Sequence, residues 1–219
     1  MLGLRWSVIP QNLPFLLQAA VTTLEISVIA VLLGLVLGWL FGLFSVSHSR
    51  LLKSITWGYV QFFRGTPLLV QILLVYFGLA GVGLNLTAFA AGVTALSLNA
   101  GAYSAEIVRA GLESIDPGQT DAADSIGLSR VETLLFILVP QAVRRVIPGI
   151  TNEMIALVKA SSLLAVIGTL ELTHAGQIII ARTFTPFEIY IAVALIYLVL
   201  VGVLSRFSYY LEKRVFLNY

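Results

Sequence analysis

The chain has 219 residues, of which 58% are hydrophobic and only 11% charged, whereas about 25% of the residues of soluble proteins are charged. Because so few polar groups cannot cover a globular surface, the composition predicts a bilayer protein, and the formal net charge of +2 is too small to indicate nucleic-acid binding. The sequence has no cysteine and two histidines, which excludes disulfides and cysteine-ligated metals and argues against a histidine-based metal site.

The N-terminal region is expected to hold a retained membrane span over about residues 13–44 rather than a cleaved leader. Arg5 is its only early charge, and no small-residue cleavage pattern interrupts the apolar run. The run is longer than the roughly 20 residues that a bilayer requires, so its start is expected to be interfacial or tilted. Gly34, Gly38 and Gly42 recur every fourth residue, which favours close helix packing over a binding site.

The second and third spans are expected over about residues 54–80 and 86–110. Arg64-Gly65-Thr66-Pro67 interrupts the second span, because glycine and proline next to a charge break a helix. The backbone groups freed there must be satisfied within protein or by a wet cavity. The third span carries Glu106 and Arg109 at i,i+3 spacing, which favours a local ion pair near its cytoplasmic end.

The stretch 111–142 is the one long segment whose composition is that of a soluble protein. Capping signals within it predict a pair of short helices, because side-chain oxygens bind the free N–H groups of a helix start and glycine favours the turn that ends a helix. The capping pairs are Asp116 with Gln119 and Ser129 with Glu132, Pro117 is the first helical position, Gly127 is the stop, and Pro140 ends the second helix. Two projecting helices suit docking to a partner in the aqueous phase.

The last two spans are expected over about residues 146–169 and 187–209. Glu153 and Lys159 lie in the first of these, and their separation corresponds to a rotation of about 120° around a helix, so the two side chains face different ways. The polar interval between the spans, residues 171–186, is expected to form an amphipathic helix at the membrane surface.

Basic residues decide the predicted orientation, because cytoplasmic loops of membrane proteins are enriched in lysine and arginine. One side carries Arg50, Lys53, Arg109, Arg130, Arg144, Arg145, Arg206, Lys213 and Arg214. The other side carries Arg5 and Arg182. The expected fold is therefore a single all-α integral membrane domain over residues 1–219, with five transmembrane helices, the N-terminus outside, and both the C-terminus and the stretch 111–142 inside.

Four stretches resemble the permease subunits of ABC importers for polar amino acids, of the histidine, glutamine or arginine type. They are FRGTPLLVQ from Phe63, LNAGAYSAEI from Leu98, the segment from Asp116 to Pro140, and the segment from Asn152 to Leu163. Within the third stretch, Asp121-Ala122-Ala123 and Gly127 have the spacing of the cytoplasmic docking loop of these permeases. The usual first residue of that loop is glutamate, so Asp121 keeps the charge but shortens the reach.

The resemblance implies a non-catalytic, multi-pass permease of the bacterial inner membrane that works as a homodimer or a paired heterodimer. It would stand on a pair of ATP-binding subunits and receive a polar amino acid from an extracytoplasmic solute-binding protein. The residues that it implies for ATPase docking are Asp121, Ala122, Ala123, Ser125 and Gly127. No G-x-x-x-x-G-K-[ST] phosphate loop occurs, so ATP and Mg²⁺ are expected on the partner ATPase, with no cofactor or metal on this chain.

The predicted substrate site is a polar pocket near mid-membrane, beside the broken helix. It comprises Thr66, Gln71, Asn99, Glu153, Lys159, Ser161 and Ser162. A zwitterionic amino acid needs an anion for its ammonium group and donors for its carboxylate, which Glu153 and Lys159 or freed N–H groups supply in this hypothesis. Glu153 also gives a lean towards basic substrates. Two alternatives stay open: each charge pairs with a neighbouring span, for example Glu153 with Arg109, or the polar groups merely wet a passage.

A second class of function also fits the charges inside the spans, namely an ion- or proton-coupled secondary carrier or channel with Glu106, Glu153 and Lys159 as a relay. The docking stretch argues against it, since a carrier has no need of two capped, projecting helices. An intramembrane enzyme has no support, because no serine and histidine occur with a recognisable catalytic spacing.

Overall fold

The computed structural model describes residues 4–216, and every regular element among them is helical, which confirms the predicted all-α class for this part of the chain. Residues 1–3 and 217–219 of the predicted domain lie outside the described range. The helices are α1 (Val8–Val46), α2 (Arg50–Gly65), α3 (Leu68–Leu73), α4 (Leu79–Gly81), α5 (Ala88–Glu113), α6 (Gly118–Ser125), α7 (Arg130–Glu132), α8 (Val139–Ala160), α9 (Leu172–Thr183) and α10 (Pro186–Phe216). π-Helical segments join α3 to α4 (Leu74–Gly78) and α7 to α8 (Thr133–Leu138), and a 3₁₀ segment (Ser161–Ile167) follows α8.

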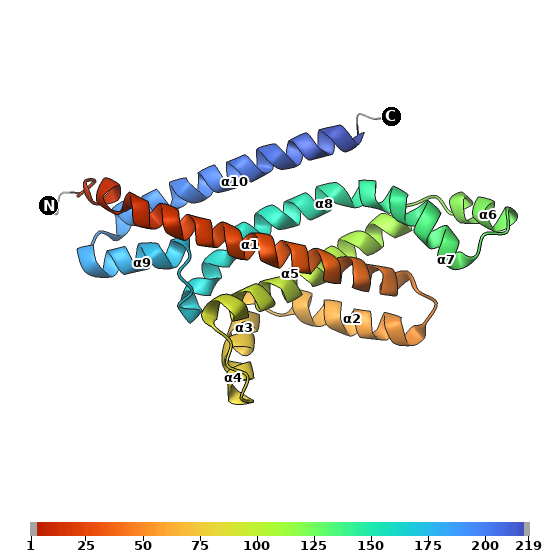
Figure 1. Cartoon of the computed structure of the whole chain (residues 1–219), viewed down its shortest axis with the longest axis horizontal. Helices are drawn as coiled ribbons and strands as arrows, with labels where there is room; N and C mark the ends of the chain where they lie inside the picture. Colours follow the sequence, from red (N-terminus) through yellow and green to blue (C-terminus); the bar gives the residue numbers. More distant parts are fainter. Residues whose placement is uncertain (1–3, 217–219) are drawn as a thin grey trace.

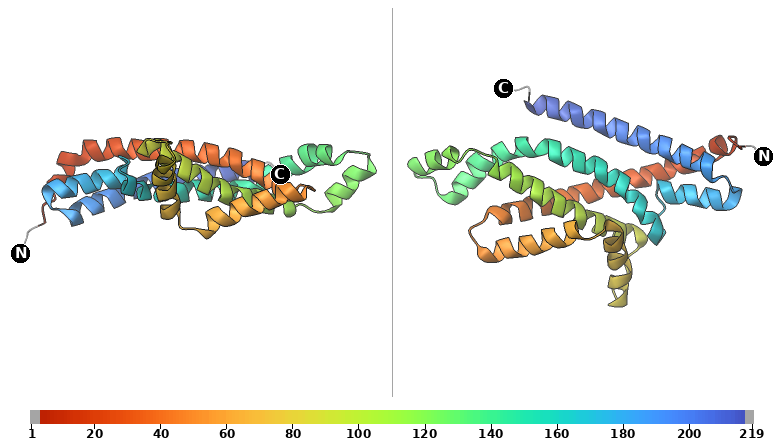
Figure 2. Two further views of the ribbon diagram at one scale, coloured as in Figure 1. Left: turned by 90° about the horizontal axis from the view of Figure 1, so that it is seen from below. Right: turned by 180° about the vertical axis from the view of Figure 1, so that it is seen from behind.

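Helices α1, α2, α5, α8 and α10 run along the length of the molecule, and the chain reverses its direction between successive members of this set (Figure 1). The α1–α2 turn and the projection formed by α6 and α7 lie at one end. Helix α9 and the start of α1 lie at the opposite end, and α3 and α4 leave the bundle sideways (Figures 1 and 2). The stretch with a soluble composition is thus held away from the body of the bundle.

Three helical stretches are long and apolar enough to cross a membrane, namely Val8–Val46, Arg130–Ile167 and Pro186–Tyr210. A fourth is added if the bent pair Arg50–Gly65 and Leu68–Gly81 counts as one span. Helix α5 is long enough but not apolar enough to be counted among these stretches, because polar residues interrupt it. Much of its surface is nevertheless buried. The structure therefore supports a membrane-embedded helical bundle with three or four such spans, and the count of five stays a prediction.

The predicted interruption of the second span is confirmed. Helix α2 ends at Gly65, Thr66 is extended with φ −116° and ψ 149°, and α3 begins at Leu68. The two helices meet at an angle of 108°. Pro67 explains the break, because a proline disfavours the helical conformation of the residue before it.

The helix after the docking stretch differs from the prediction, because it does not end at Pro140. Helix α7, the π-helical segment and α8 form a continuous helical path from Arg130 to Ala160, in which Pro140 sits in the first turn of α8. A proline within a helical path has no N–H group to donate to the preceding turn. The π-helical segment Thr133–Leu138 lies just before Pro140, and its wider turn allows the helix to continue there.

The apolar core beside the helix break lies where α1, α5 and α8 meet. Ile26, Leu96 and Leu157 are almost completely buried there. Ile72 from α3 and Leu164 from the 3₁₀ segment complete the cluster and are also fully buried. The break in the second span therefore lies against a fully buried part of the bundle.

The glycine stripe of α1 lies directly against α5. A Cβ atom added at Gly34 would lie 2.9 Å from the Cβ of Ala100, and one added at Gly38 would lie 2.3 Å from the Cβ of Ser104. Such distances are far below normal contact, so only glycine permits this approach of the two backbones. The prediction of close helix packing is confirmed, and α1 serves as the support of α5.

The first testable prediction concerns Gly38→Ala. The added methyl group collides with an atom attached directly to the α5 backbone, so the two helices must separate, and overpacking of this kind costs about 1–3 kcal/mol. We expect a lower Tm in thermal unfolding of the detergent-solubilised protein. Gly202→Ala on α10 is the matched control, because nothing lies within 4 Å of a Cβ added there. Equal Tm values for both variants would contradict the proposed close contact.

Candidate functional site

A polar cavity lies at the helix break, between the Thr66 turn, α5 and α8. Its volume is about 320 Å³. It is lined by Thr66, Leu68, Asn99, Tyr103, Glu153, Ala156, Leu157 and Ala160. Three of the predicted substrate residues, Thr66, Asn99 and Glu153, are thus brought together from three separate segments.

Gln71 lies behind the wall of this cavity and satisfies the broken backbone. Its side chain is 2% exposed. Its amide nitrogen donates to the carbonyl oxygens of Phe63 (2.8 Å) and Thr66 (3.0 Å). Its amide oxygen accepts from Asn99 Nδ2 at 3.0 Å, which ties the break to α5. Because these bonds occupy the Gln71 amide, Gln71 shapes the cavity wall and does not reach into it.

Glu153 enters the cavity from α8 without a partner. Among residues 4–216 no ion pair or hydrogen bond involves its carboxylate. The alternative that Glu153 pairs with Arg109 is wrong, because Arg109 pairs with Glu106 and Glu113 on its own helix. The predicted i,i+3 pair of Glu106 and Arg109 is confirmed, with Nε and Oε2 3.1 Å apart. Glu153 is therefore a half-buried acid facing a cavity with no cation among its lining residues.

The other three predicted substrate residues lie elsewhere. Lys159 and Ser162 line a second cavity of about 390 Å³ against α9 and α10, together with Tyr190 and Tyr197. Ser161 is completely buried, and its hydroxyl donates to the carbonyl oxygen of Val158 at 2.8 Å. The ligand roles of these residues stay predictions, but they do not share one cavity with Glu153.

A buried carboxylate fixes the start of α9 next to this second cavity. Glu171 accepts hydrogen bonds from the backbone N–H groups of Thr173 (2.9 Å) and His174 (2.7 Å) and from the hydroxyl of Tyr197 (2.9 Å). Burial raises the pKa of Glu171, although these hydrogen bonds act in the opposite direction. The arrangement is a helix cap that links α9 to α10.

Two residues next to the first cavity were missed by the sequence reasoning. Tyr103 lines it, four residues after Asn99 on the same face of α5, a spacing that could have revealed it. Arg64 lies beside Tyr103, with its guanidinium carbon 5.4 Å from the centre of the ring. Arg64 also lies 3.8 Å from a carboxylate oxygen of Glu106. No spacing rule connects residues so far apart in the chain.

The docking stretch forms the two expected short helices, α6 and α7. The capping box of Ser129 and Glu132 is confirmed, and so is the glycine stop, since Gly127 has φ 79°. Helix α6 begins one residue later than predicted, at Gly118, whose N–H group donates to Asp116 Oδ1 at 2.7 Å. Gln119 does not complete a capping box there, because its side-chain oxygen accepts instead from Gln141 Nε2 at 3.1 Å.

Four of the five predicted docking residues face outwards. Asp121, Ala122, Ser125 and Gly127 are exposed, whereas Ala123 is only 3% exposed and packs inwards. Ile126, which the sequence reasoning passed over, follows the end of α6 and is 76% exposed. The small residues Ala122 and Gly127 therefore flank an exposed apolar side chain.

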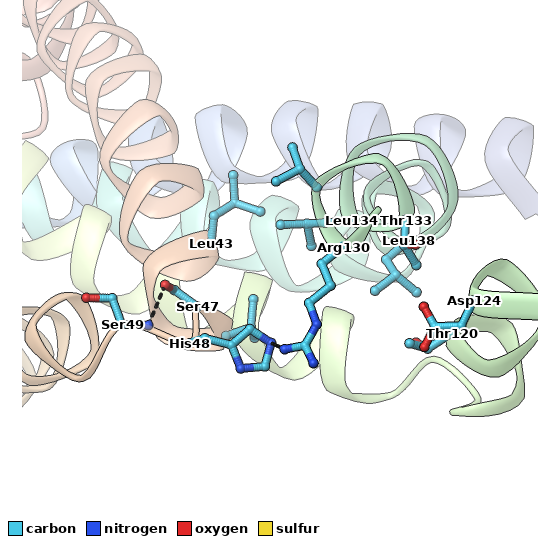
Figure 3. Close-up of a pocket in the computed structure, with 12 residues that line it drawn as sticks. Leu43, Ser47, His48, Ser49, Thr120, Asp124, Arg130, Thr133, Leu134 and Leu138 are labelled. Carbon is cyan, nitrogen blue, oxygen red and sulfur yellow. Dashed lines mark hydrogen bonds between the residues drawn. The ribbon is translucent and has the colours of Figure 1, made fainter. Parts of the chain in front are cut away.

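A cavity of about 590 Å³ separates this projection from the α1–α2 turn (Figure 3). It is lined by Leu43, Val46, Ser47, His48, Ser49, Thr120, Asp124, Arg130, Val131, Thr133, Leu134 and Leu138. Arg130 spans it and donates to Nε2 of His48 at 2.6 Å. None of the predicted docking residues lines this cavity, and all of them except Ala123 are exposed. Among the described residues, no three histidine or acidic side chains gather closely enough to hold a metal ion.

Comparison with known proteins gives a consistent result. Residues 30–217 match the family described as "Binding-protein-dependent transport system inner membrane component". The chain is 40% identical over 211 residues to the "Glutamine transport system permease protein GlnP" of Escherichia coli (strain K12), which covers 95% of this chain and 96% of that protein.

Solved structures agree with this result. The fold superposes on a crystal structure of an amino acid ABC transporter with histidines with a TM-score of 0.91 and 37% sequence identity, over 97% of this chain and 100% of that one. The MetNI methionine ABC transporter in an inward-facing conformation gives a TM-score of 0.81 at 19% identity, over 94% of this chain and 98% of that one, which shows a shared fold alone.

The second prediction concerns Gln71→Leu. Leucine fills a similar volume but removes the donor to the Thr66 carbonyl and the acceptor of Asn99 Nδ2, whereas the Phe63 carbonyl keeps Asn99 Nδ2 at 3.2 Å. A buried unsatisfied polar group costs about 1–3 kcal/mol. We expect a clearly lower Tm in detergent. Gln61→Leu on the exposed face of α2 is the control, with little change expected. An unchanged Tm for Gln71→Leu would show that Gln71 is not what satisfies the break.

Proposed function

We propose that this chain, which belongs to the family of binding-protein-dependent transport system inner membrane components, passes a polar amino acid through the cavity at its helix break. A separate ATPase, in contact with α6, would drive this transport. The chain is an ABC importer permease for amino acids, located in the bacterial inner membrane. The observation that carries the proposal is similarity to amino acid permeases along nearly the whole chain, combined with an unpaired acid in a polar cavity.

The proposed topology has five spans, at about residues 13–44, 54–80, 86–110, 146–169 and 187–209. The alternating directions of α1, α2, α5, α8 and α10 support it (Figure 1). Arg50, Lys53 and Arg130 lie at the end that carries the α6–α7 projection. The enrichment of basic residues in cytoplasmic loops supports a cytoplasmic location for this end. The N-terminus then lies outside, the C-terminus inside, and the stretch 111–142 is the cytoplasmic coupling loop.

The proposed energy source is an ATPase on another chain, because this sequence has no phosphate loop. ATP and Mg²⁺ would bind there, and the permease itself would catalyse no reaction. Helix α6 is the proposed contact, since Asp121, Ala122, Ser125 and Gly127 are exposed on a projecting, well-capped element. A second permease copy or paralogue and an extracytoplasmic solute-binding protein complete the proposed complex.

The proposed substrate contacts are Thr66, Asn99 and Glu153, with Gln71 as their support. Glu153 would face the ammonium group of the substrate, because an unpaired carboxylate in a cavity favours a cation. The Escherichia coli relative is named for glutamine, and the similar crystal structure is that of an amino acid transporter with histidines. Polar amino acids, with a lean towards basic ones from Glu153, are the proposed class.

The relay of a secondary carrier receives no support from the geometry. Glu106 is paired with Arg109, Glu153 faces the cavity at the helix break, and Lys159 lines a different cavity. A proton or ion relay needs groups that are joined by hydrogen bonds or bridging waters. These three residues do not form such a chain.

The third prediction tests the substrate contact through Glu153→Gln. Charge-assisted hydrogen bonds contribute about 1.5–3 kcal/mol, so the apparent affinity for the amino acid should fall by about tenfold or more. The measurement is amino-acid-stimulated ATPase activity of the reconstituted complex with glutamine, histidine or arginine. Glu25→Gln, at an exposed position of α1, is the control. Unchanged affinity for every amino acid would rule out Glu153 as a contact, and equal losses for glutamine and arginine would refute the lean towards basic substrates.

The fourth prediction tests docking through Ala122→Trp. Ala122 is exposed, so the bulky side chain leaves the fold intact but prevents α6 from entering a groove of the ATPase. We expect loss of co-purification with the ATPase subunit. Ala181→Trp, at an exposed alanine of α9 at the other end of the molecule, is the matched control and should retain the ATPase. Retention by both variants would show that α6 is not the docking element.

A further inference from the structure

The cavity at the helix break has a charged partner for only one of the two charges of a zwitterion. Glu153 is its one charged lining residue, so the cavity can hold an ammonium group but has no partner for a carboxylate. Lys159, the cation expected there, lines the other cavity. An amino acid that lost its carboxylate hydration without a cation or donors in return would bind poorly.

Arg64 is the cation placed next to this cavity. It stands two residues before Thr66, and its guanidinium group lies over Tyr103, 5.4 Å from the centre of the ring. Thr66 and Tyr103 both line the cavity. Arginine combines a fork of donors that matches a carboxylate with a planar group that stacks on an aromatic ring, so Tyr103 is a suitable platform for it.

The present partner of Arg64 holds it only weakly. Its Nη1 atom lies 3.8 Å from Oε2 of Glu106, beyond hydrogen-bond distance, and the Arg64 side chain is 39% exposed. Ion pairs with this geometry and exposure contribute little to stability. Arg64 can therefore turn to another carboxylate at small cost.

Glu106 does not depend on Arg64 either. Arg109 donates to both of its carboxylate oxygens, through Nε to Oε2 at 3.1 Å and through Nη2 to Oε1. Arg109 also pairs with Glu113. If Arg64 leaves, Glu106 keeps a bidentate partner, so no uncompensated charge is left near the cavity. The cluster thus contains one firmly held arginine and one exchangeable arginine.

Resting on the proposed function, we propose that Arg64 is the carboxylate-binding residue of the substrate site. When an amino acid enters, the guanidinium group moves from Glu106 to the α-carboxylate of the substrate while remaining on the face of Tyr103. The ammonium group of the substrate faces Glu153 on the opposite, α8 side of the cavity. The site then selects compounds that carry both groups, because each charge of the zwitterion meets its own partner.

The test is equilibrium binding of a radiolabelled amino acid to the purified complex of permease and ATPase, without the solute-binding protein. The probes are arginine, histidine or glutamine, and the α-carboxamide of the same amino acid, which lacks the negative charge. We expect Arg64→Gln to weaken amino acid binding by about tenfold or more, and Arg64→Lys to restore part of it. The carboxamide should bind the wild type and Arg64→Gln equally weakly.

The controls separate a ligand contact from a structural effect. Arg182→Gln makes the same change at an exposed position of α9 and should bind the amino acid like the wild type. Unchanged amino acid binding by Arg64→Gln, or an equal loss for the amino acid and its carboxamide, would overturn the assignment. Failure of the wild type to bind any of the three amino acids would also overturn it. ATP-driven uptake with the solute-binding protein then decides separately whether the proposed function still stands.

Discussion

The need to satisfy a broken backbone inside a membrane governs the rest of this structure. No water is available in the hydrocarbon region, so carbonyl groups freed at a helix break require donors from the protein. The single amide group of Gln71 reaches the carbonyls of Phe63 and Thr66 and binds Asn99 of α5. This network places Thr66 and Asn99 on one cavity wall, opposite Glu153 of α8. The cavity exists because the second span cannot continue straight.

The same helices connect the cavity to the α6–α7 projection. Helix α5 carries Asn99 and ends at Glu113, just before α6, and α8 carries Glu153 and is continuous with α7. A force applied to α6 would therefore act on both helices that bear the polar groups of the cavity. Helix α1 supports α5 through its glycines, so a tilt of α5 would be transmitted as movement of a packed pair. Such rigid-body motion is an established route for switching transitions.

Local signals in the sequence predicted the local features well. The capping box of Ser129 and Glu132, the stop at Gly127 and the break before Pro67 depend on a few neighbouring residues, and each is confirmed. Long-range features were missed for a physical reason. The 3₁₀ segment after α8 carries Ser161 and Ser162 beyond the end of that helix, and the approach of Arg64 to Tyr103 depends on how α2 crosses α5. Neither is encoded in the spacing of residues.

The central claim is that a polar amino acid binds in the cavity between the helix break, α5 and α8. An experimental structure of the assembled complex, determined in the presence of glutamine, arginine or histidine, tests it most directly. We predict density for one amino acid in that cavity, with its ammonium group within hydrogen-bond distance of Glu153. Density confined to the cavity beside Lys159, or an empty cavity at saturating substrate, would contradict the claim.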